Sequence, residues 1–382
     1  MKQSFQFGID VLCNDHVDWL RGLRVGLVAH AASVSASGIP SPELLRHCGV
    51  DLTSLFGPEH GFLSCGSAGE EMSHGTHRSL GIPVYSLYGE TRKPTAKMLK
   101  NVDVIVFDLH DLGARPYTYV STLRLVLEAA AENGKRVIVA DRPSPLAGTV
   151  DGPMLKPSFE SFVSFVRTPV VYGMTPGEMA LWLRNDLMLN VDVRMAPMAG
   201  FRRGIQPKRT WIRPSPAIRS WECGLCFPIT VFLEALPALD HGRGTESPFQ
   251  RVGAPWLDAK GLSRELNAMK LPGLRFASSR YKAATGSYKG HIVQGLNIHV
   301  TNASEYLPVQ ATMAILRTVQ DVHGSGRLWS HPGTREAFFD QLMGTDTVRR
   351  TLIAGQTLVE ITAPWALQSA DFWQSRKACL RY

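Results

Sequence analysis

The chain has 382 residues, more than one typical domain, so two domains are expected. Its 44% hydrophobic and 19% charged residues are ordinary for a globular protein, and no apolar run approaches the roughly 18 residues that a membrane span needs. The net charge of +8 is dispersed rather than gathered in a basic tract, which argues against nucleic-acid binding and suits a small anionic substrate.

The N-terminus and the cysteines indicate a protein of a reducing compartment. The first residues, MKQSFQFGIDVLCND, contain no apolar signal core, so we expect a cytoplasmic protein; a leader trimmed from the chain would instead indicate export. The scattered cysteines are too few for a disulfide scaffold in a chain of this length. Cys223 and Cys226 form the only C-x-x-C pair, without the second pair of a structural zinc site and without a thioredoxin-like context.

The first half of the chain alternates short apolar segments with helical ones. The helical segments begin near Ser41 (SPELLRHC), Pro94 (PTAKMLK), Tyr119 and Thr175. The apolar segments are continuous enough to be parallel strands that helices cover on both faces; they span residues 24–30, 50–56, 82–88, 102–108, 136–141 and 191–196. This alternation predicts an α/β fold, with a Rossmann-like, doubly wound sheet domain over residues 1–204.

The fourth helical segment has a clear start signal. Thr175-Pro176-Gly177-Glu178 reads as a capping box with proline at the first helical position. Glu178 is therefore interpreted as a helix cap and not as a catalytic carboxylate.

The second half is more irregular. After loop-like stretches rich in glycine and proline, the sequence predicts a helix near 259–269, strands at 274–279 and 293–301, a helix near 308–322 and further helical segments to the end. We interpret residues 205–382 as a smaller α+β domain and expect a cleft between the two domains.

Polar side chains follow several of the predicted strands. His30 follows the first strand, Glu59 and His60 follow the second, residues 108–115 follow the fourth, and residues 141–142 follow the fifth. In doubly wound sheets, ligands bind beyond the carboxyl ends of the strands. The sequence therefore predicts one functional rim at this edge.

No cofactor motif accompanies this rim. The loop after the first strand, HAASVSASG, lacks G-x-G-x-x-G, and the chain contains no G-x-x-x-x-G-K-[ST], no H-E-x-x-H and no G-x-S-x-G. His60, His74, His77, Asp108 and His110 show no compact metal-ligand spacing. We expect a cofactor-independent protein without a metal site.

The stretch FGPEHGFLSCGSAGEE, residues 56–71, is the strongest candidate site. Its glycines let the backbone approach a ligand closely, and a buried Glu59 would suit a general acid. Glu70 or Glu71 can fold back toward Glu59 and supply the second carboxylate that glycoside hydrolysis requires. The alternative is a solvated acidic loop.

Two further segments offer substrate-binding groups. In FDLHDLGARPYTY, Asp108 and Asp111 suit sugar hydroxyls and Arg115 suits a substrate carboxylate, with Tyr117 beside them; the alternative is a network that braces the sheet edge. In HGRGTESPF, Arg243 lies between two glycines and can face a ligand, or can brace the two domains. His30 and His60 complete the predicted binding residues.

The ordered motifs resemble those of a bacterial family, the NamZ-like exo-β-N-acetylmuramidases, formerly a family of unknown function. The similarity spans nearly the whole chain and is carried by FGPEHGF, AGE, GIPVYSLYGETRKPT, VFDLHDLGARPYTYVSTL, DRPSPLAG, GMTPGEMA, GRGTESPF and GAPW. The resemblance implies a Rossmann-like domain, a smaller C-terminal domain, and removal of terminal N-acetylmuramic acid from the non-reducing end of peptidoglycan fragments. It implies Glu59 as the acid or acid/base, Glu70 as its partner, and Arg115 as the ligand of the lactyl carboxylate of muramic acid.

Some positions depart from the family pattern. Ser144 and Ala217 stand where asparagine is usual, Cys65 stands where an acidic residue is common, and Glu234-Ala235-Leu236 stands where EGT is usual. These departures keep two alternatives open beside the muramidase: a metal-dependent amidase or deacetylase on the same fragments, and a protein that binds muropeptides without catalysis.

Overall fold

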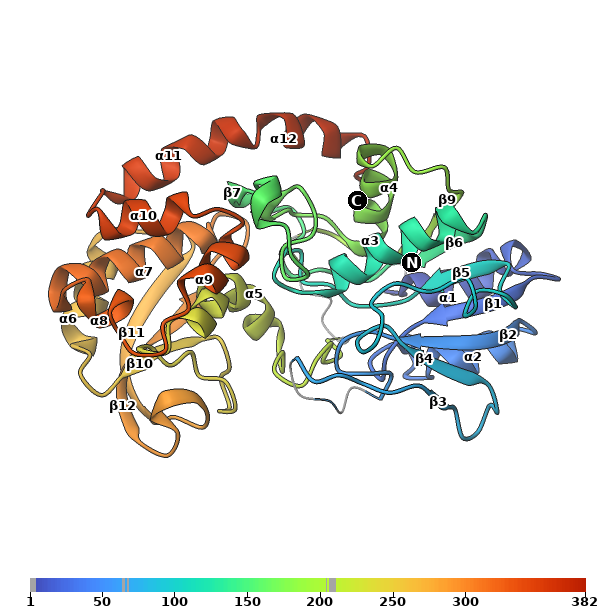
Figure 1. Cartoon of the computed structure of the whole chain (residues 1–382), viewed down its shortest axis with the longest axis horizontal. Coiled ribbons are helices and arrows are strands. Elements are labelled where there is room, and N and C mark those ends of the chain that lie inside the picture. Colours follow the sequence, from blue (N-terminus) through green and yellow to red (C-terminus); the bar gives the residue numbers. More distant parts are fainter. Residues whose placement is uncertain (1–4, 64–65, 67–68, 204, 206–210) are drawn as a thin grey trace.

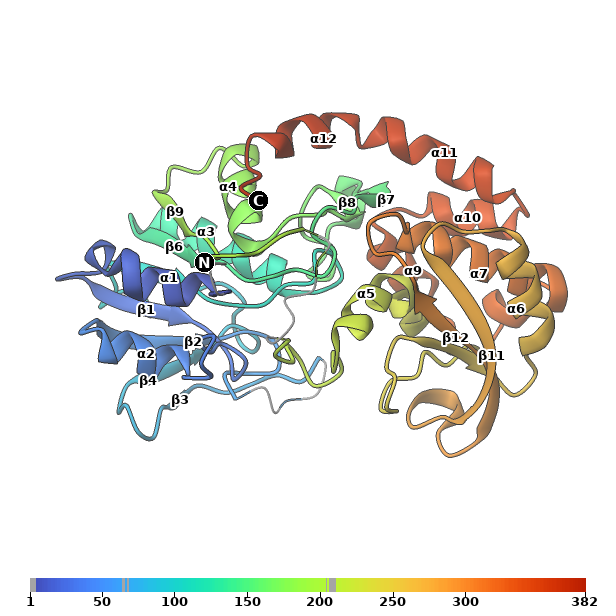
Figure 2. The ribbon, with the colours of Figure 1, turned by 180° about the vertical axis from the view of Figure 1, so that it is seen from behind.

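The computed structural model describes residues 5–63, 66, 69–203, 205 and 211–382. It has two lobes, an N-terminal lobe (residues 5–203) and a C-terminal lobe (211–382), which lie side by side in Figures 1 and 2. The domain boundary predicted at 204/205 stays a prediction, because residues 204 and 206–210 lie outside the described residues. No helix in the described part of the chain is long and apolar enough to cross a membrane.

The N-terminal lobe is built on a seven-stranded sheet. Its strand order is β3-β4-β2-β1-β5-β6-β9, and all neighbouring pairs are parallel except β3 with β4. Strand order reverses at β1, as in doubly wound folds, so the prediction of a Rossmann-like sheet is confirmed. The strands are β1 (Arg24–Val28), β2 (Asp51–Gly57), β3 (Gly75–Thr76), β4 (Pro83–Ser86), β5 (Val104–Phe107), β6 (Arg136–Ala140) and β9 (Val193–Ala196).

Alternate residues of each central strand enter two separate cores, because successive side chains of a strand point to opposite faces. On β5, Val104 and Val106 join the core beneath helices α1 (Gly8–Asp15) and α2 (Ser41–His47). Ile105 and Phe107 join the core beneath α3 (Tyr119–Glu132) and α4 (Pro176–Asp186). Both faces of the sheet are thus covered, which explains why the strands read as continuous apolar runs.

The predicted capping box is confirmed, whereas one predicted helix is wrong. The Thr175 hydroxyl accepts from the Glu178 backbone, and the Glu178 carboxylate accepts from the Thr175 N–H. Residues 94–100 form turns instead of a helix. Helix nucleation is costly for a segment of seven residues, so its tertiary contacts decide the outcome; α2, which has the same length, does form a helix.

The C-terminal lobe contains a small antiparallel sheet covered by helices. Its strand order is β10-β12-β11, from β10 (Arg251–Ala254), β11 (Leu274–Lys282) and β12 (Ile292–Val300). The predicted strands and helices of this half are present, and α5 (Trp221–Thr230) is an additional helix that the sequence did not indicate. The helices of the lobe are α5, α6 (Ala259–Ala268), α7 (Pro308–His323), α8 (Gly326–Trp329), α9 (Glu336–Met343), α10 (Thr347–Ile353), α11 (Leu358–Gln368) and α12 (Ala370–Lys377).

The last helices return to the N-terminal lobe. Figures 1 and 2 show α11 and α12 arching over both lobes, with the C-terminus beside α4. The Tyr382 hydroxyl donates to the buried Asp141 carboxylate (2.7 Å), and the Arg381 N–H donates to Glu178 (2.7 Å). A short pair, β7 (Asp151–Met154) with β8 (Pro169–Val171), lies near this arch. The C-terminal helices therefore connect the C-terminal lobe back to the N-terminal lobe.

Candidate active site

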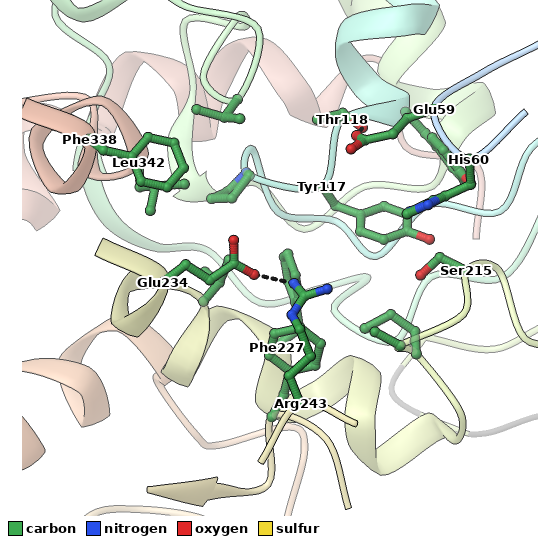
Figure 3. Close-up of a pocket in the computed structure, with 17 residues that line it drawn as sticks. Glu59, His60, Tyr117, Thr118, Ser215, Phe227, Glu234, Arg243, Phe338 and Leu342 are labelled. Carbon is green, nitrogen blue, oxygen red and sulfur yellow. Dashed lines mark hydrogen bonds and ion pairs between the residues drawn. The ribbon is translucent and has the colours of Figure 1, made fainter. Parts of the chain in front are cut away.

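A pocket between the lobes is lined by residues from both of them (Figure 3). It encloses about 620 Å³ of space, part of it open to solvent. The N-terminal lobe contributes Glu59, His60, Pro116, Tyr117, Thr118, Tyr119 and Val163. The C-terminal lobe contributes Ser215, Ala217, Ile218, Phe227, Val231, Glu234, Arg243, Phe249, Phe338 and Leu342.

Glu59 is presented by the end of β2. The strand ends at Gly57, and Glu59 is 9% exposed. Its Oε1 accepts from the Gly69 N–H (2.8 Å) and its Oε2 accepts from the Thr118 hydroxyl (2.6 Å), at the start of α3. A Cβ on Gly57 would lie 2.6 Å from the Phe62 nitrogen, so only glycine lets the chain fold back here. The two donors, from separate segments, fix one orientation of the carboxylate in the pocket.

The residue after Glu59 has a strained backbone. His60 has a φ of +71°, and its ring nitrogen Nδ1 lies 2.9 Å from the Gly66 carbonyl, while the Gly66 N–H donates to the His60 carbonyl (3.1 Å). Phe249, across the pocket, has a φ of +63°. Non-glycine residues with positive φ are uncommon and gather at functional sites, so two of them lining one pocket point to function there.

Tyrosines form the wall next to Glu59. Tyr117 and Tyr119 pack edge to face with ring centroids 4.9 Å apart, and the Tyr119 hydroxyl donates to the Pro214 carbonyl (3.0 Å). Burial raises the pKa of both phenols, and the nearby Glu59 carboxylate adds to the effect. Both therefore stay protonated at neutral pH and offer an aromatic surface, with the Tyr117 hydroxyl toward Ser215 in Figure 3.

An ion pair forms the opposite wall. Glu234 lies in the 3₁₀ helix Val231–Ala235, and its carboxylate pairs with Nη2 of Arg243. The Arg243 guanidinium also lies over the Phe249 ring, 5.2 Å from its centroid. Figure 3 shows this pair facing Glu59 across the pocket. The pocket therefore contains two carboxylates and one guanidinium, supplied by different lobes.

Asp108 does not line this pocket, and its role as a sugar ligand stays a prediction. It is fully buried, and its carboxylate binds Arg142 through Nε (2.5 Å) and Nη2 (2.8 Å) and accepts from the Ser41 hydroxyl (2.5 Å). The Arg142 guanidinium in turn lies over the Phe7 ring. This network fills the space beyond β1 and β5, where the strand order reverses and doubly wound folds usually bind their ligand.

Arg115 is also buried and does not line the pocket, so its role as the carboxylate ligand stays a prediction that this placement does not support. Its Nη2 donates to the Met343 carbonyl (2.7 Å) in the C-terminal lobe, and its Nη1 donates to the Thr168 carbonyl in the N-terminal lobe. It is 0% exposed, and burial lowers the pKa of the guanidinium to about 9. Arg115 braces the two lobes directly behind Pro116 and the pocket wall.

Asp111 is likewise buried and does not line the pocket, and its contact with sugar hydroxyls stays a prediction. Its Oδ1 accepts from the Gly113 N–H (2.6 Å) and from the Tyr172 hydroxyl. Burial raises the pKa of Asp111 to about 7, against the lowering effect of these two hydrogen bonds. The carboxyl group is neutral in the folded protein over much of the acidic range.

This raised pKa predicts a pH dependence of stability. Below about pH 3.8 the Asp111 carboxyl is protonated in both the folded and the unfolded chain, and its contribution to stability is fully present. As the pH rises toward about 7, the unfolded chain ionises first and the contribution is lost. Relative to Asp111→Asn, the wild type should lose free energy of unfolding between these pH values, measured by urea denaturation. Parallel pH curves for the two proteins would contradict the assignment.

His30 and Glu70 do not line the pocket. His30 is buried behind Tyr119, with ring centroids 5.4 Å apart, and burial, Arg142 and His60 lower its pKa to about 3. Glu70 is exposed and follows Gly69, whose N–H binds Glu59. The pocket does contain Glu59, His60, Tyr117 and Arg243 of the predicted site residues. The roles assigned to all of these residues stay predictions.

The sequence missed Glu234 as a site residue. In the sequence, Glu234 stands out only as part of a departure from the family pattern. Its pairing with Arg243 depends on the tertiary fold, which the sequence pattern does not reveal. Ala217, another departure, also lines the pocket, whereas Ser144 is buried outside it and Cys65 lies outside the described residues. Within the described ranges, no group of three or more His, Cys, Asp or Glu side chains is arranged to hold a metal ion.

Comparisons with known proteins agree along the whole chain. The family model described as exo-β-N-acetylmuramidase NamZ, N-terminal, matches residues 25–222, and its C-terminal counterpart matches residues 225–382. The peptidoglycan β-N-acetylmuramidase NamZ of Bacillus subtilis (strain 168) is 33% identical over 386 residues, which covers 100% of this chain and 92% of that protein.

Two solved structures have the same fold. A crystal structure of a DUF1343 family protein from Bacteroides fragilis NCTC 9343 matches with a TM-score of 0.91 at 32% identity and covers 99% of both chains. A second DUF1343 family protein of that strain matches with a TM-score of 0.79 at 23% identity, over 100% of this chain and 99% of the other. The second likeness concerns the fold alone.

Proposed function

The chain belongs to the NamZ exo-β-N-acetylmuramidase family, and from this premise we propose that the pocket between the lobes is its active site, with Glu59 as the acid/base group. The protein is a glycoside hydrolase that acts on peptidoglycan. It releases terminal β-linked N-acetylmuramic acid from the non-reducing end of peptidoglycan fragments.

The placement of Glu59 is the observation that carries the proposal. Among the predicted catalytic residues it alone combines burial, two fixed hydrogen-bond donors and a position in the pocket wall. A carboxyl group held in this way can meet the glycosidic oxygen in one orientation, which is the main requirement for proton transfer. The aromatic wall of Tyr117 and Tyr119 suits the apolar face of a sugar ring.

The chemistry assigned to Glu59 is proton transfer to the leaving group. As the bond between C1 and the glycosidic oxygen breaks, the Glu59 carboxyl proton moves to that oxygen; a water molecule finally adds to C1 and gives one proton to a carboxylate of the pair. A second carboxylate attacks C1 or activates the water. Glu70 stays our predicted partner because it directly follows Gly69, and Glu234 is the second candidate because it lines the same pocket.

The test of the function is release of 4-nitrophenol from 4-nitrophenyl β-N-acetylmuramide. We expect turnover by the wild type, together with release of N-acetylmuramic acid from the non-reducing end of a peptidoglycan disaccharide. Binding of the sugar without any turnover would instead favour a protein that senses muropeptides.

The same assay with a chelator separates a glycosidase from a metal-dependent amidase. Proton transfer from a carboxyl group to the glycosidic oxygen needs no metal ion, so we expect the rate with EDTA to stay within about twofold of the untreated rate. The comparison is made on one preparation before chelation, after chelation and after addition of zinc. A loss of activity that zinc restores would contradict the carboxylate mechanism.

A further inference from the structure

Arg243 is presented to the pocket by a tight glycine turn. Gly242 and Gly244 on its two sides have φ values of +71° and +83°. A Cβ on Gly242 would lie 2.8 Å from the Ser247 carbonyl oxygen, and one on Gly244 would lie 3.0 Å from the Ala284 side chain. The loop therefore holds Arg243 in one position, and Figure 3 shows its guanidinium directed into the pocket.

The guanidinium keeps hydrogen-bonding capacity for a ligand. Its Nη2 binds the Glu234 carboxylate, and within the described part of the chain its side chain makes no other hydrogen bond. An arginine has five N–H donors, so Nη1 and Nε remain available. The Arg243 side chain is 28% exposed, in contrast to the fully buried Arg115.

One guanidinium in the pocket can bind an anionic group of the substrate. Of the described residues that line it, Arg243 is the only arginine, and none is a lysine. Glu59 lies on the opposite wall and offers no cationic donor, whereas Nη1 and Nε of Arg243 can still donate to an anionic group. A carboxylate on the sugar thus has one favourable direction in which to bind.

We propose that Arg243 binds the lactyl carboxylate of the N-acetylmuramic acid residue, and that Glu234 is the positioning residue that holds Arg243 in place. The inference rests on the proposed function, and it moves the carboxylate contact from Arg115 to the opposite lobe. Glu234 has a second anchor, because its backbone carbonyl accepts from Arg335 (2.6 Å). A fixed guanidinium binds a planar carboxylate better than a mobile one, because less side-chain entropy is lost on binding.

The test compares two substrates that differ only in this charge: 4-nitrophenyl β-N-acetylmuramide and its lactyl methyl ester. For the wild type, we expect kcat/KM for the acid to exceed that for the ester about 10- to 100-fold, as for a hydrogen bond to a charged group. In Arg243→Gln the ratio should fall to about one. Any loss common to both substrates cancels in the ratio.

Two further variants separate positioning from general structural damage. Glu234→Gln should partly lower the ratio of kcat/KM for the acid to that for the ester, mainly by raising KM for the acid. The reason is that Arg243 loses the carboxylate that holds its guanidinium in place. Arg264→Gln, which removes an exposed arginine from the same lobe, should keep the wild-type ratio. If Glu234→Gln instead reduces kcat equally for acid and ester, Glu234 belongs to the catalytic pair and its positioning role is overturned.

Binding measurements distinguish a failure of this inference from a failure of the function. By calorimetry, the Glu59→Gln protein should bind N-acetylmuramic acid about 10- to 100-fold more tightly than its methyl ester, and addition of Arg243→Gln should abolish the difference. An active wild type whose acid-to-ester ratio is unchanged in Arg243→Gln would overturn the role of Arg243 alone. An inactive wild type that still binds the acid through Arg243 would overturn the function alone.

Discussion

Glu59→Gln should lower kcat about 10²- to 10⁴-fold on a disaccharide of N-acetylmuramic acid β-linked to N-acetylglucosamine, because the sugar oxygen that leaves needs a proton and an amide cannot donate it. The substitution keeps the size of the side chain and an oxygen that can accept from the Gly69 N–H. We therefore expect KM to change by no more than about threefold and the protein to remain folded. Steady-state kinetics at several substrate concentrations measure both quantities.

The control for this variant is Glu43→Gln. Glu43 lies on α2, is exposed and does not line the pocket, so its kinetics should match the wild type. If Glu59→Gln kept kcat within about tenfold of the wild type, Glu59 would not be the acid, since general acid catalysis contributes at least 10²-fold. Glu70 and Glu234 would then be the carboxylates to substitute next.

Asp108→Ala should destabilise the protein by about 3–5 kcal/mol, because it leaves the buried Arg142 cation without its carboxylate. Asp108→Asn keeps one acceptor oxygen and should cost less, so it provides a soluble variant if the alanine variant fails to fold. Urea unfolding of both variants measures the loss in free energy. The reason is structural: the pair is fully buried and fills the place where the strand order of the sheet reverses.

Asp103→Ala is the matched control for Asp108. Asp103 also binds an arginine through two contacts, Arg24 Nη2 at 2.7 Å and Nε at 3.0 Å, but this pair is exposed. Its loss should cost far less than the loss of the buried pair, because solvent screens exposed charges. A change in KM at Asp108 with an unchanged free energy of unfolding would support the role of sugar ligand that the sequence first suggested.

The fold was largely predictable because each strand carries its own signal. The buried strands of a covered parallel sheet are continuous apolar runs, and six such runs coincide with β1, β2, β4, β5, β6 and β9. The segment 94–100 was misjudged because a helical composition over seven residues does not ensure a helix. The glycine-rich turn after β2 gave the position of Glu59, since a turn at a strand end is a local feature.

The binding residues were harder to predict because their roles depend on the direction in which their side chains point. Asp108, Asp111 and Arg115 all follow a strand, as ligand-binding residues do, yet their side chains point into the protein. Sequence position gives the edge of the sheet at which a side chain starts, and not whether it points inward. Glu234 and Arg243 come from the other lobe and meet Glu59 only through the packing of the two lobes.

The most direct test of the account is a crystal structure of the Glu59→Gln variant with an uncleaved disaccharide of N-acetylmuramic acid β-linked to N-acetylglucosamine. We expect the glycosidic oxygen to lie within about 2.6–3.2 Å of the side chain at position 59. We also expect the muramic acid ring to lie in the pocket between the lobes, with its lactyl carboxylate on Arg243. A disaccharide bound elsewhere on the protein, or with its glycosidic oxygen turned away from position 59, would contradict the account.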